Sequence, residues 1–147
     1  MGLKVYLPLA VVVFLAATTG ADLIARTSIA GETFGFALRE HLYYLRVQLV
    51  GTMLLFAPFA AVALACARAE MKARSRSPAL IFAVAMLALL YFYFEGHQGA
   101  QYALKEEKWT AAALSIGGLP FFIGLPVVVA VFGAAALAAK LDRRMLD

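Results

Sequence analysis

The sequence predicts an all-α, polytopic membrane protein whose four transmembrane helices form an up-down bundle. Three observations lead to this fold class: 64% of the 147 residues are hydrophobic, the mean hydropathy is +0.85, and short charged connectors separate four long apolar stretches. These stretches cover about residues 5–22, 47–67, 78–95 and 119–139. Each is close to the roughly 20 residues that a helix needs to cross a hydrocarbon core about 30 Å thick. The stretches and their connectors use up the chain, so we expect a single membrane domain, residues 1–147.

The charges of the connectors predict the orientation of this bundle. Basic residues dominate both tails and the connector after the second stretch, whereas acidic residues offset the basic ones in the other two connectors. The basic residues concerned are Lys4, Arg68, Lys72, Arg74, Arg76, Lys140, Arg143 and Arg144. By the positive-inside rule, the middle connector and both termini are cytoplasmic. We therefore expect a multi-pass protein of the bacterial inner membrane, N-in and C-in.

A short interfacial helix is expected between the first and second stretches. Residues 37–49 read ALREHLYYLRVQL, in which leucines recur at helical spacing. Arg39, Tyr43 and Arg46 fall on one line of this helix. With Arg26, at the end of the first stretch, they are candidates for binding a lipid phosphate through charge-assisted hydrogen bonds. Anchoring at the membrane surface, with snorkelling arginines and tyrosines in the aromatic belt, is the alternative.

Small residues at helical spacing occur in the second and fourth stretches. They let helix backbones approach closely in lipid, and so predict packing seams that face either this chain or a partner. The residues are Ala57, Ala61, Ala65, Ala130, Ala134 and Ala138. In the second stretch, Pro58 is expected to bend the helix because it removes a backbone hydrogen bond.

The third stretch ends in the densest polar segment of the sequence. It begins at Ser77-Pro78, a typical helix start. If the helix continues past Phe94, it carries a polar stripe with steps of four, three and four residues. That stripe consists of Tyr91, Glu95, Gln98 and Tyr102.

The fourth apolar region is longer than one span requires, and GGLP at residues 117–120 interrupts it. We favour a short interfacial helix from Trp109 to Ile116, followed by a span that begins near Pro120. One tilted and kinked helix is the alternative.

Both histidines, His41 and His97, are expected at the outer membrane boundary. With Asp22 and Glu95 they are candidate metal ligands, since imidazole and carboxylate suit zinc, copper or iron. Ligation of a haem by the two histidines is the alternative. Neither has motif support, because Glu95-x-His97 is not the HExxH spacing. No cofactor is favoured, and the single cysteine excludes an intrachain disulfide.

These observations favour a small non-catalytic protein, an accessory or structural subunit of a larger membrane complex. Its partners would be membrane lipids and other integral membrane subunits, contacted through the small-residue seams. Two alternatives remain: an outer-face redox module that binds a metal, haem or quinone, and an enzyme or transporter that acts on lipid-linked phosphates at the outer face. No triad, P-loop or dinucleotide motif is present. Nucleic acid is not an expected partner, because the basic excess flanks the spans.

Overall fold

The computed structural model describes residues 2–71 and 77–144, which form helices and short connections without a strand. The elements follow the chain as α1 (Leu3–Leu15), η1 (Ala16–Gly20), α2 (Ala21–Ser28), α3 (Phe34–Val47), α4 (Leu49–Glu70), α5 (Ser77–Lys105), α6 (Trp109–Gly117), η2 (Pro120–Gly124) and α7 (Leu125–Arg144). The segments η1 and η2 are single π-helical turns. Of the basic residues used to predict orientation, Lys72, Arg74 and Arg76 lie outside the described residues, as do the side chains of Arg143 and Arg144.

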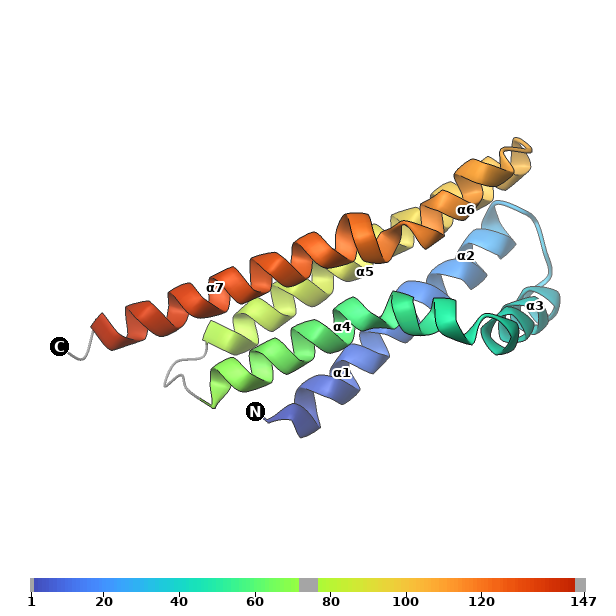
Figure 1. Cartoon of the computed structure of the whole chain (residues 1–147). Helices are drawn as coiled ribbons and strands as arrows, with labels where there is room; N and C mark the ends of the chain where they lie inside the picture. Colours follow the sequence, from blue (N-terminus) through green and yellow to red (C-terminus); the bar gives the residue numbers. More distant parts are fainter. Residues whose placement is uncertain (1, 72–76, 145–147) are drawn as a thin grey trace.

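Four helical segments are long and apolar enough to cross a membrane, which confirms the predicted all-helical class and number of spans. They are Leu3–Ser28, Leu49–Glu70, Ser77–Lys105 and Trp109–Leu141. All four exceed the predicted stretches, because the helices continue into the polar sequence at their ends. Figure 1 shows that α1 begins and α7 ends at the same end of the bundle. The side of the membrane to which this end belongs remains a prediction.

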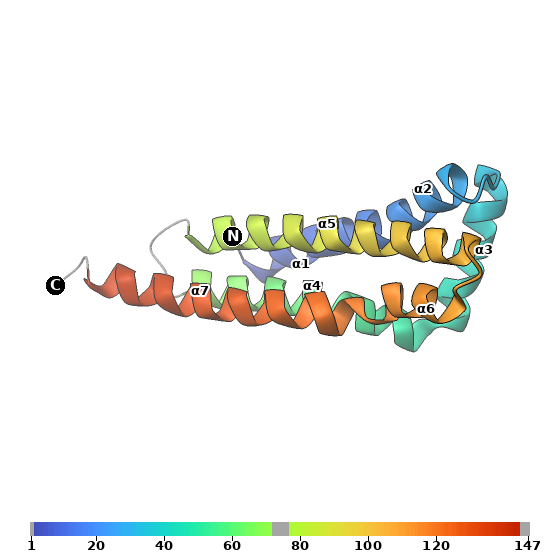
Figure 2. The ribbon, with the colours of Figure 1, turned by 90° about the horizontal axis from the view of Figure 1, so that it is seen from above.

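Helices α4 and α5 pack against each other at the centre of the bundle. The first span lies against both of them, and α7 lies against both as well. Seen from above in Figure 2, α6 runs back along α5 and leads through η2 into α7. The backbone of α6 comes close at Gly96, where an added Cβ would lie 2.9 Å from the carbonyl oxygen of Ser115. Only glycine fits this approach without a shift.

Helix α3 is separate from α4 and lies across the end of the bundle that is opposite the two termini (Figures 1 and 2). The backbone turns at Gln48, whose φ of −110° and ψ of 45° are not helical. Ala37 and His41, one turn apart on α3, are both buried. The predicted helix before the second span therefore exists, and it presents one face to the bundle. Its location at the membrane interface remains a prediction.

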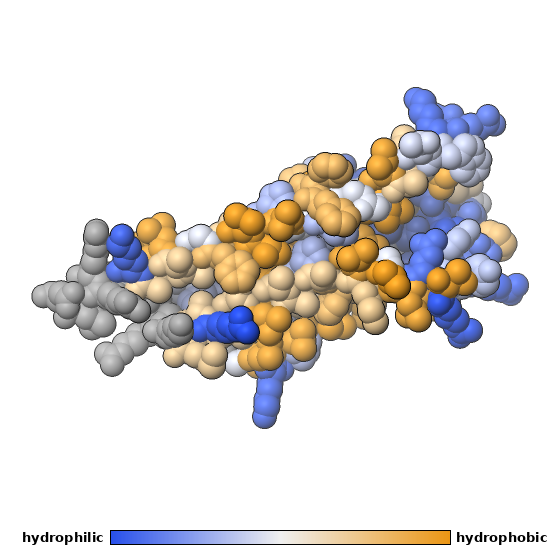
Figure 3. Space-filling view, in the orientation of Figure 1, coloured by the Kyte–Doolittle hydropathy of each residue, from blue (hydrophilic) through white to orange (hydrophobic). Residues whose placement is uncertain are grey.

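The interior is held together by aromatic side chains in edge-to-face contact. The ring of Phe59 on α4 lies 5.4 Å from Phe14 of the first span and 5.0 Å from Tyr93 of α5, measured between ring centroids. Such geometry is favourable because the positive edge of one ring meets the negative face of another. On the face drawn in Figure 3, apolar side chains cover the middle of the bundle and hydrophilic ones lie toward its ends. This distribution suits a hydrocarbon layer between two aqueous phases.

The fourth span comes very close to α4 at Gly124, in the π-helical turn η2. A Cβ built on Gly124 would lie 2.9 Å from the Cβ of Pro58 and still closer to its ring. The proline at the middle of α4 therefore packs directly against glycine backbone. At Gly133, which lies in α7, an added Cβ would meet only open space.

We predict that Gly124→Ala destabilises the bundle, because the added methyl group forces α4 and η2 apart. Overpacking of this kind typically costs about 1–3 kcal/mol. Gly133→Ala is the matched control and should leave stability unchanged or slightly raised, because alanine favours helix. Thermal unfolding in detergent can be followed with a thiol-reactive fluorophore, since Cys66 is the only cysteine and is buried. Equal midpoints for the two variants would contradict the close contact.

Candidate functional site

Asp22 lies at the centre of a buried polar cluster near the end of the bundle that α3 crosses. Asp22 is only 7% exposed. It lies on α2, six residues before the first span ends at Ser28. That separation is about 9 Å along a helix. A buried carboxylate is expensive unless donors surround it. The structure supplies two such donors, Arg26 from α2 and His41 from α3, and it brings His97 of α5 close to the same carboxylate.

His41 of α3 is fully engaged by this cluster. Its Nδ1 lies 2.8 Å from Oδ2 of Asp22, and its Nε2 lies 2.9 Å from the hydroxyl oxygen of Thr19. A carboxylate only accepts hydrogen bonds, so Nδ1 carries the proton and donates it. In the neutral ring, Nε2 then accepts from Thr19. Thr19 lies in the π-helical turn η1, a type of irregularity frequent at functional sites.

Arg26 joins the cluster one turn after Asp22 on α2. Its Nε donates to Oδ2 of Asp22 over 3.0 Å, and its Nη1 donates to Glu32 over 3.4 Å. The guanidinium carbon also lies 5.8 Å from the ring centroid of Tyr44. The single cation is thus held between two carboxylates and against an aromatic face.

His97 of α5 completes the cluster but has no hydrogen-bond partner. Its Nδ1 lies 3.9 Å from Oδ1 of Asp22, which is too far for a direct hydrogen bond. Both ring nitrogens are buried without any partner among the described residues, and the residue is 6% exposed. An unpaired buried polar group costs about 1–3 kcal/mol. Such a group requires an explanation, and one explanation is that its hydrogen-bond partner is a bound ligand.

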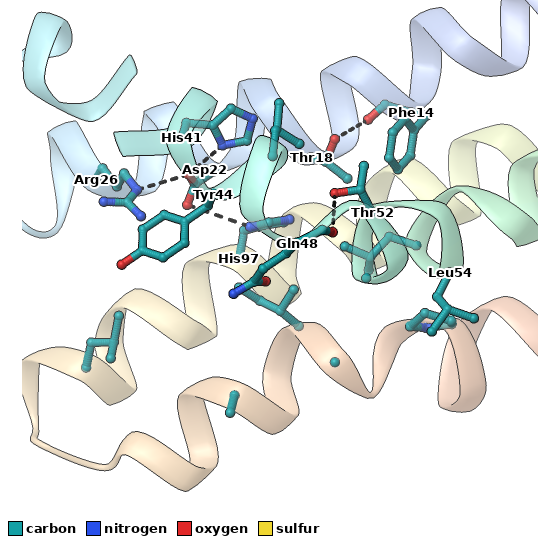
Figure 4. A pocket seen from close by; sticks show the side chains of 18 of the residues that line it. Phe14, Thr18, Asp22, Arg26, His41, Tyr44, Gln48, Thr52, Leu54 and His97 are labelled. Carbon is teal, nitrogen blue, oxygen red and sulfur yellow. Dashed lines mark hydrogen bonds and ion pairs between the residues drawn. The ribbon is translucent and has the colours of Figure 1, made fainter. Parts of the chain in front are cut away.

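A cavity of about 480 Å³ lies directly beside the side chains of Asp22 and His97. Figure 4 shows Asp22 between His41, Arg26 and His97, with the remaining labelled residues around the space. Each of the four candidate spans and α3 contributes to the lining, which is mainly apolar away from the cluster. Its size falls within the roughly 300–1,000 Å³ typical of small-molecule sites. The cavity therefore combines one polar end with apolar walls.

Three of the predicted metal ligands come together, and the fourth does not. Asp22, His41 and His97 meet in the cluster, whereas Glu95 is exposed on α5. Glu95 and His97 are two positions apart on one helix, so they point in nearly opposite directions. Among the described residues, no group of three or more histidine, cysteine, aspartate or glutamate side chains is arranged to hold a metal ion. His41 also has both ring nitrogens engaged, which leaves none for a haem iron.

The predicted phosphate ligands divide in the same way. Arg26 lines the cavity, but Arg39, Tyr43 and Arg46 are exposed on the outer face of α3. They lie on the side of α3 opposite His41, as their separation along the helix requires. The predicted polar stripe of α5 also points outward: Tyr91, Glu95 and Tyr102 are exposed, and Gln98 is half-buried.

The predicted packing seams are used only in part inside this chain. Ala65 is buried, Ala61, Ala134 and Ala138 are half-buried, and Ala57 and Ala130 are exposed. The seam of α4 thus enters the core toward its carboxyl end, while that of α7 lies at the edge of the bundle.

Several residues of the cluster and of the cavity wall were not singled out from the sequence. Thr18 lines the cavity and Thr19 contacts His41; they are consecutive hydroxyl residues inside an apolar run, which is a readable signal. Tyr44, Gln48 and Thr52 line the cavity where α3 gives way to α4. They line the cavity because the backbone turns at Gln48. The sequence does not predict this turn, since neither glycine nor proline stands at Gln48 or directly beside it.

Comparison of this chain with known protein families, with curated proteins and with solved structures finds no match.

Proposed function

We propose that this protein binds a lipid-soluble small molecule, whose polar head lies against Asp22 and His97 and whose apolar part fills the rest of the cavity. The single observation that carries this proposal is His97. Its two ring nitrogens are buried and have no hydrogen-bond partner among the described residues, and His97 lines the cavity next to Asp22. Ionisable residues inside a membrane bundle are rare and mark ligand or ion sites. A ligand head would supply the missing hydrogen bonds.

The cavity walls suggest how such a molecule reaches the site. Leu54 of α4 is 47% exposed and Phe121 of η2 is 59% exposed, and both line the cavity. We infer that the space reaches the surface between α4 and η2. In a bundle that spans a membrane, this surface faces lipid. A lipid-soluble molecule would enter sideways from the bilayer without crossing water.

A variant that fills the cavity tests this proposal. Gly51 lines the cavity, and a Cβ there would meet only Gln48, at 3.9 Å. We therefore expect Gly51→Leu to fold and to place its side chain in the space that the ligand uses. Native mass spectrometry of gently extracted wild-type protein should show a bound lipid-soluble molecule. In Gly51→Leu its occupancy should fall at least about tenfold, a loss of about 1.4 kcal/mol.

The matched control is Gly35→Leu, at an exposed position of α3 with open space around it. This variant should keep the bound molecule at the wild-type level. A wild-type protein that carries no such molecule, or a Gly51→Leu variant that retains it fully, would refute the proposal.

A second candidate function, subunit of a larger membrane complex, is favoured by the exposure of the fourth span. Within the most apolar 18 residues of each span, 11% are buried in Trp109–Leu141 and 33% in each of the other three. Small residues at its surface, Ala130 and Gly133, would let a partner helix approach. In this function the fourth span packs against another integral membrane protein.

Replacement of a small residue on this span separates the two functions. Gly133→Leu should reduce co-purification of an integral membrane partner, because the larger side chain blocks helix contact while its position has open space within the chain. The same variant should leave ligand occupancy unchanged. If wild type and Gly133→Leu retain identical sets of co-purifying proteins, this span is not a subunit interface of this kind.

A further inference from the structure

The formally charged groups that line the cavity balance each other. They are the carboxylate of Asp22 and the guanidinium of Arg26, joined by the 3.0 Å hydrogen bond. Glu32 contacts Arg26 from outside this cavity. An anionic head would lie beside the Asp22 carboxylate, and a cationic head would lie beside the Arg26 guanidinium. Because like charges in a site of low dielectric repel strongly, an uncharged head suits these walls best.

The open hydrogen-bonding capacity is equally specific. Oδ2 of Asp22 already accepts from Arg26 and His41, whereas Oδ1 lies 3.9 Å from Nδ1 of His97. One oxygen atom placed between Oδ1 of Asp22 and Nδ1 of His97 could bridge this distance with two hydrogen bonds of about 2.8 Å. The bridging oxygen must donate to the carboxylate and accept from the imidazole N–H. A hydroxyl group does both. A carbonyl oxygen only accepts, so it cannot form a hydrogen bond with the carboxylate, which is also an acceptor.

Three aromatic side chains line the cavity that contains this position. Phe14, Tyr44 and Phe121 line the cavity from the first span, from α3 and from η2. Aromatic rings pack well against another ring in stacked or edge-to-face geometry. A planar ring that carries the hydroxyl is therefore better accommodated than a flexible aliphatic alcohol.

We propose that the molecule bound in this cavity is a membrane quinol, with one ring hydroxyl bridging Oδ1 of Asp22 and Nδ1 of His97 and the apolar tail leaving between α4 and η2. The site favours the quinol over the corresponding quinone, because only the quinol offers a proton to Asp22. This inference rests on the proposed function. It adds the class of the ligand and its redox state.

The two histidines make the test direct, since they are the only ones in the chain. Protein labelled with ¹⁵N in its histidine rings gives two sets of side-chain signals, which a His97→Gln variant assigns. Wild-type protein in lipid nanodiscs is titrated with a short-chain benzoquinol under reducing conditions. Parallel titrations use the matching benzoquinone and the dimethyl ether of the quinol, which keeps the ring but has no hydroxyl. Phosphatidic acid and a long-chain alcohol are the remaining comparators.

We expect the quinol to shift the His97 signals saturably and with a larger amplitude than the His41 signals. The quinone and the dimethyl ether should each bind at least about tenfold more weakly, the loss expected when a buried acceptor is left unpaired. Glu95→Gln, an exposed change on the same helix, is the control and should titrate as wild type does.

The outcomes separate this inference from the proposed function. Equal affinity for the quinol and its dimethyl ether, or for quinol and quinone, overturns the hydroxyl bridge. Saturable shifts with phosphatidic acid or the long-chain alcohol but not with the quinol overturn the ligand class while the amphiphile-binding function stands. If none of these molecules shifts the His97 signals and none is bound in the native protein, both proposals fail, and a bridging water is sufficient for the gap.

Discussion

The structure depends on one constraint, the burial of the Asp22 carboxylate inside a helical bundle that is otherwise suited to lipid. A charge in this position is costly unless partners compensate it. Compensation requires His41 from α3 and Arg26 from the following turn of α2. It therefore explains why α3 lies across the end of the bundle and turns one face inward. The carboxylate links the first span, the connector helix and, through the unfilled gap to His97, the third span.

The cavity lies where three of the helices are irregular. Regular helices packed along their full length would fill the space between them with side chains. Here a π-helical turn in the first span, the break at Gln48 and a second π-helical turn in the fourth span all occur beside the cavity. The space left between them has the Asp22 cluster on one side, and its apolar walls include Leu54 of α4 and Phe121 of η2, which are both exposed. A polar end and an apolar opening to lipid are what a molecule with a polar head and an apolar body requires.

The number of spans and three members of the cluster follow from the sequence, because hydropathy and the scarcity of polar residues determine them. Asp22, His41 and His97 are conspicuous since few ionisable groups lie so close to apolar stretches. Their directions were harder to predict. Glu95 was grouped with His97 by position along the chain, yet two residues of separation place them on different faces of α5. Arg39 and Arg46 were correctly placed on one line of a helix, but this line faces away from the bundle and from Arg26. The rotation of each helix is set by tertiary packing, which a single sequence does not contain.

The most direct test of this account is a double-mutant cycle between Asp22 and His41. Asp22→Ala, His41→Ala and the double variant are unfolded reversibly in mixed micelles, and the free energy of unfolding is followed by the helical circular dichroism signal. If these side chains depend on each other as the 2.8 Å contact indicates, each single variant loses most of what the double variant loses. The double variant should then be more stable than additivity allows by more than about 1 kcal/mol, within the range of direct contacts. Additive losses would show that the two residues act independently and would contradict the central role of the buried carboxylate.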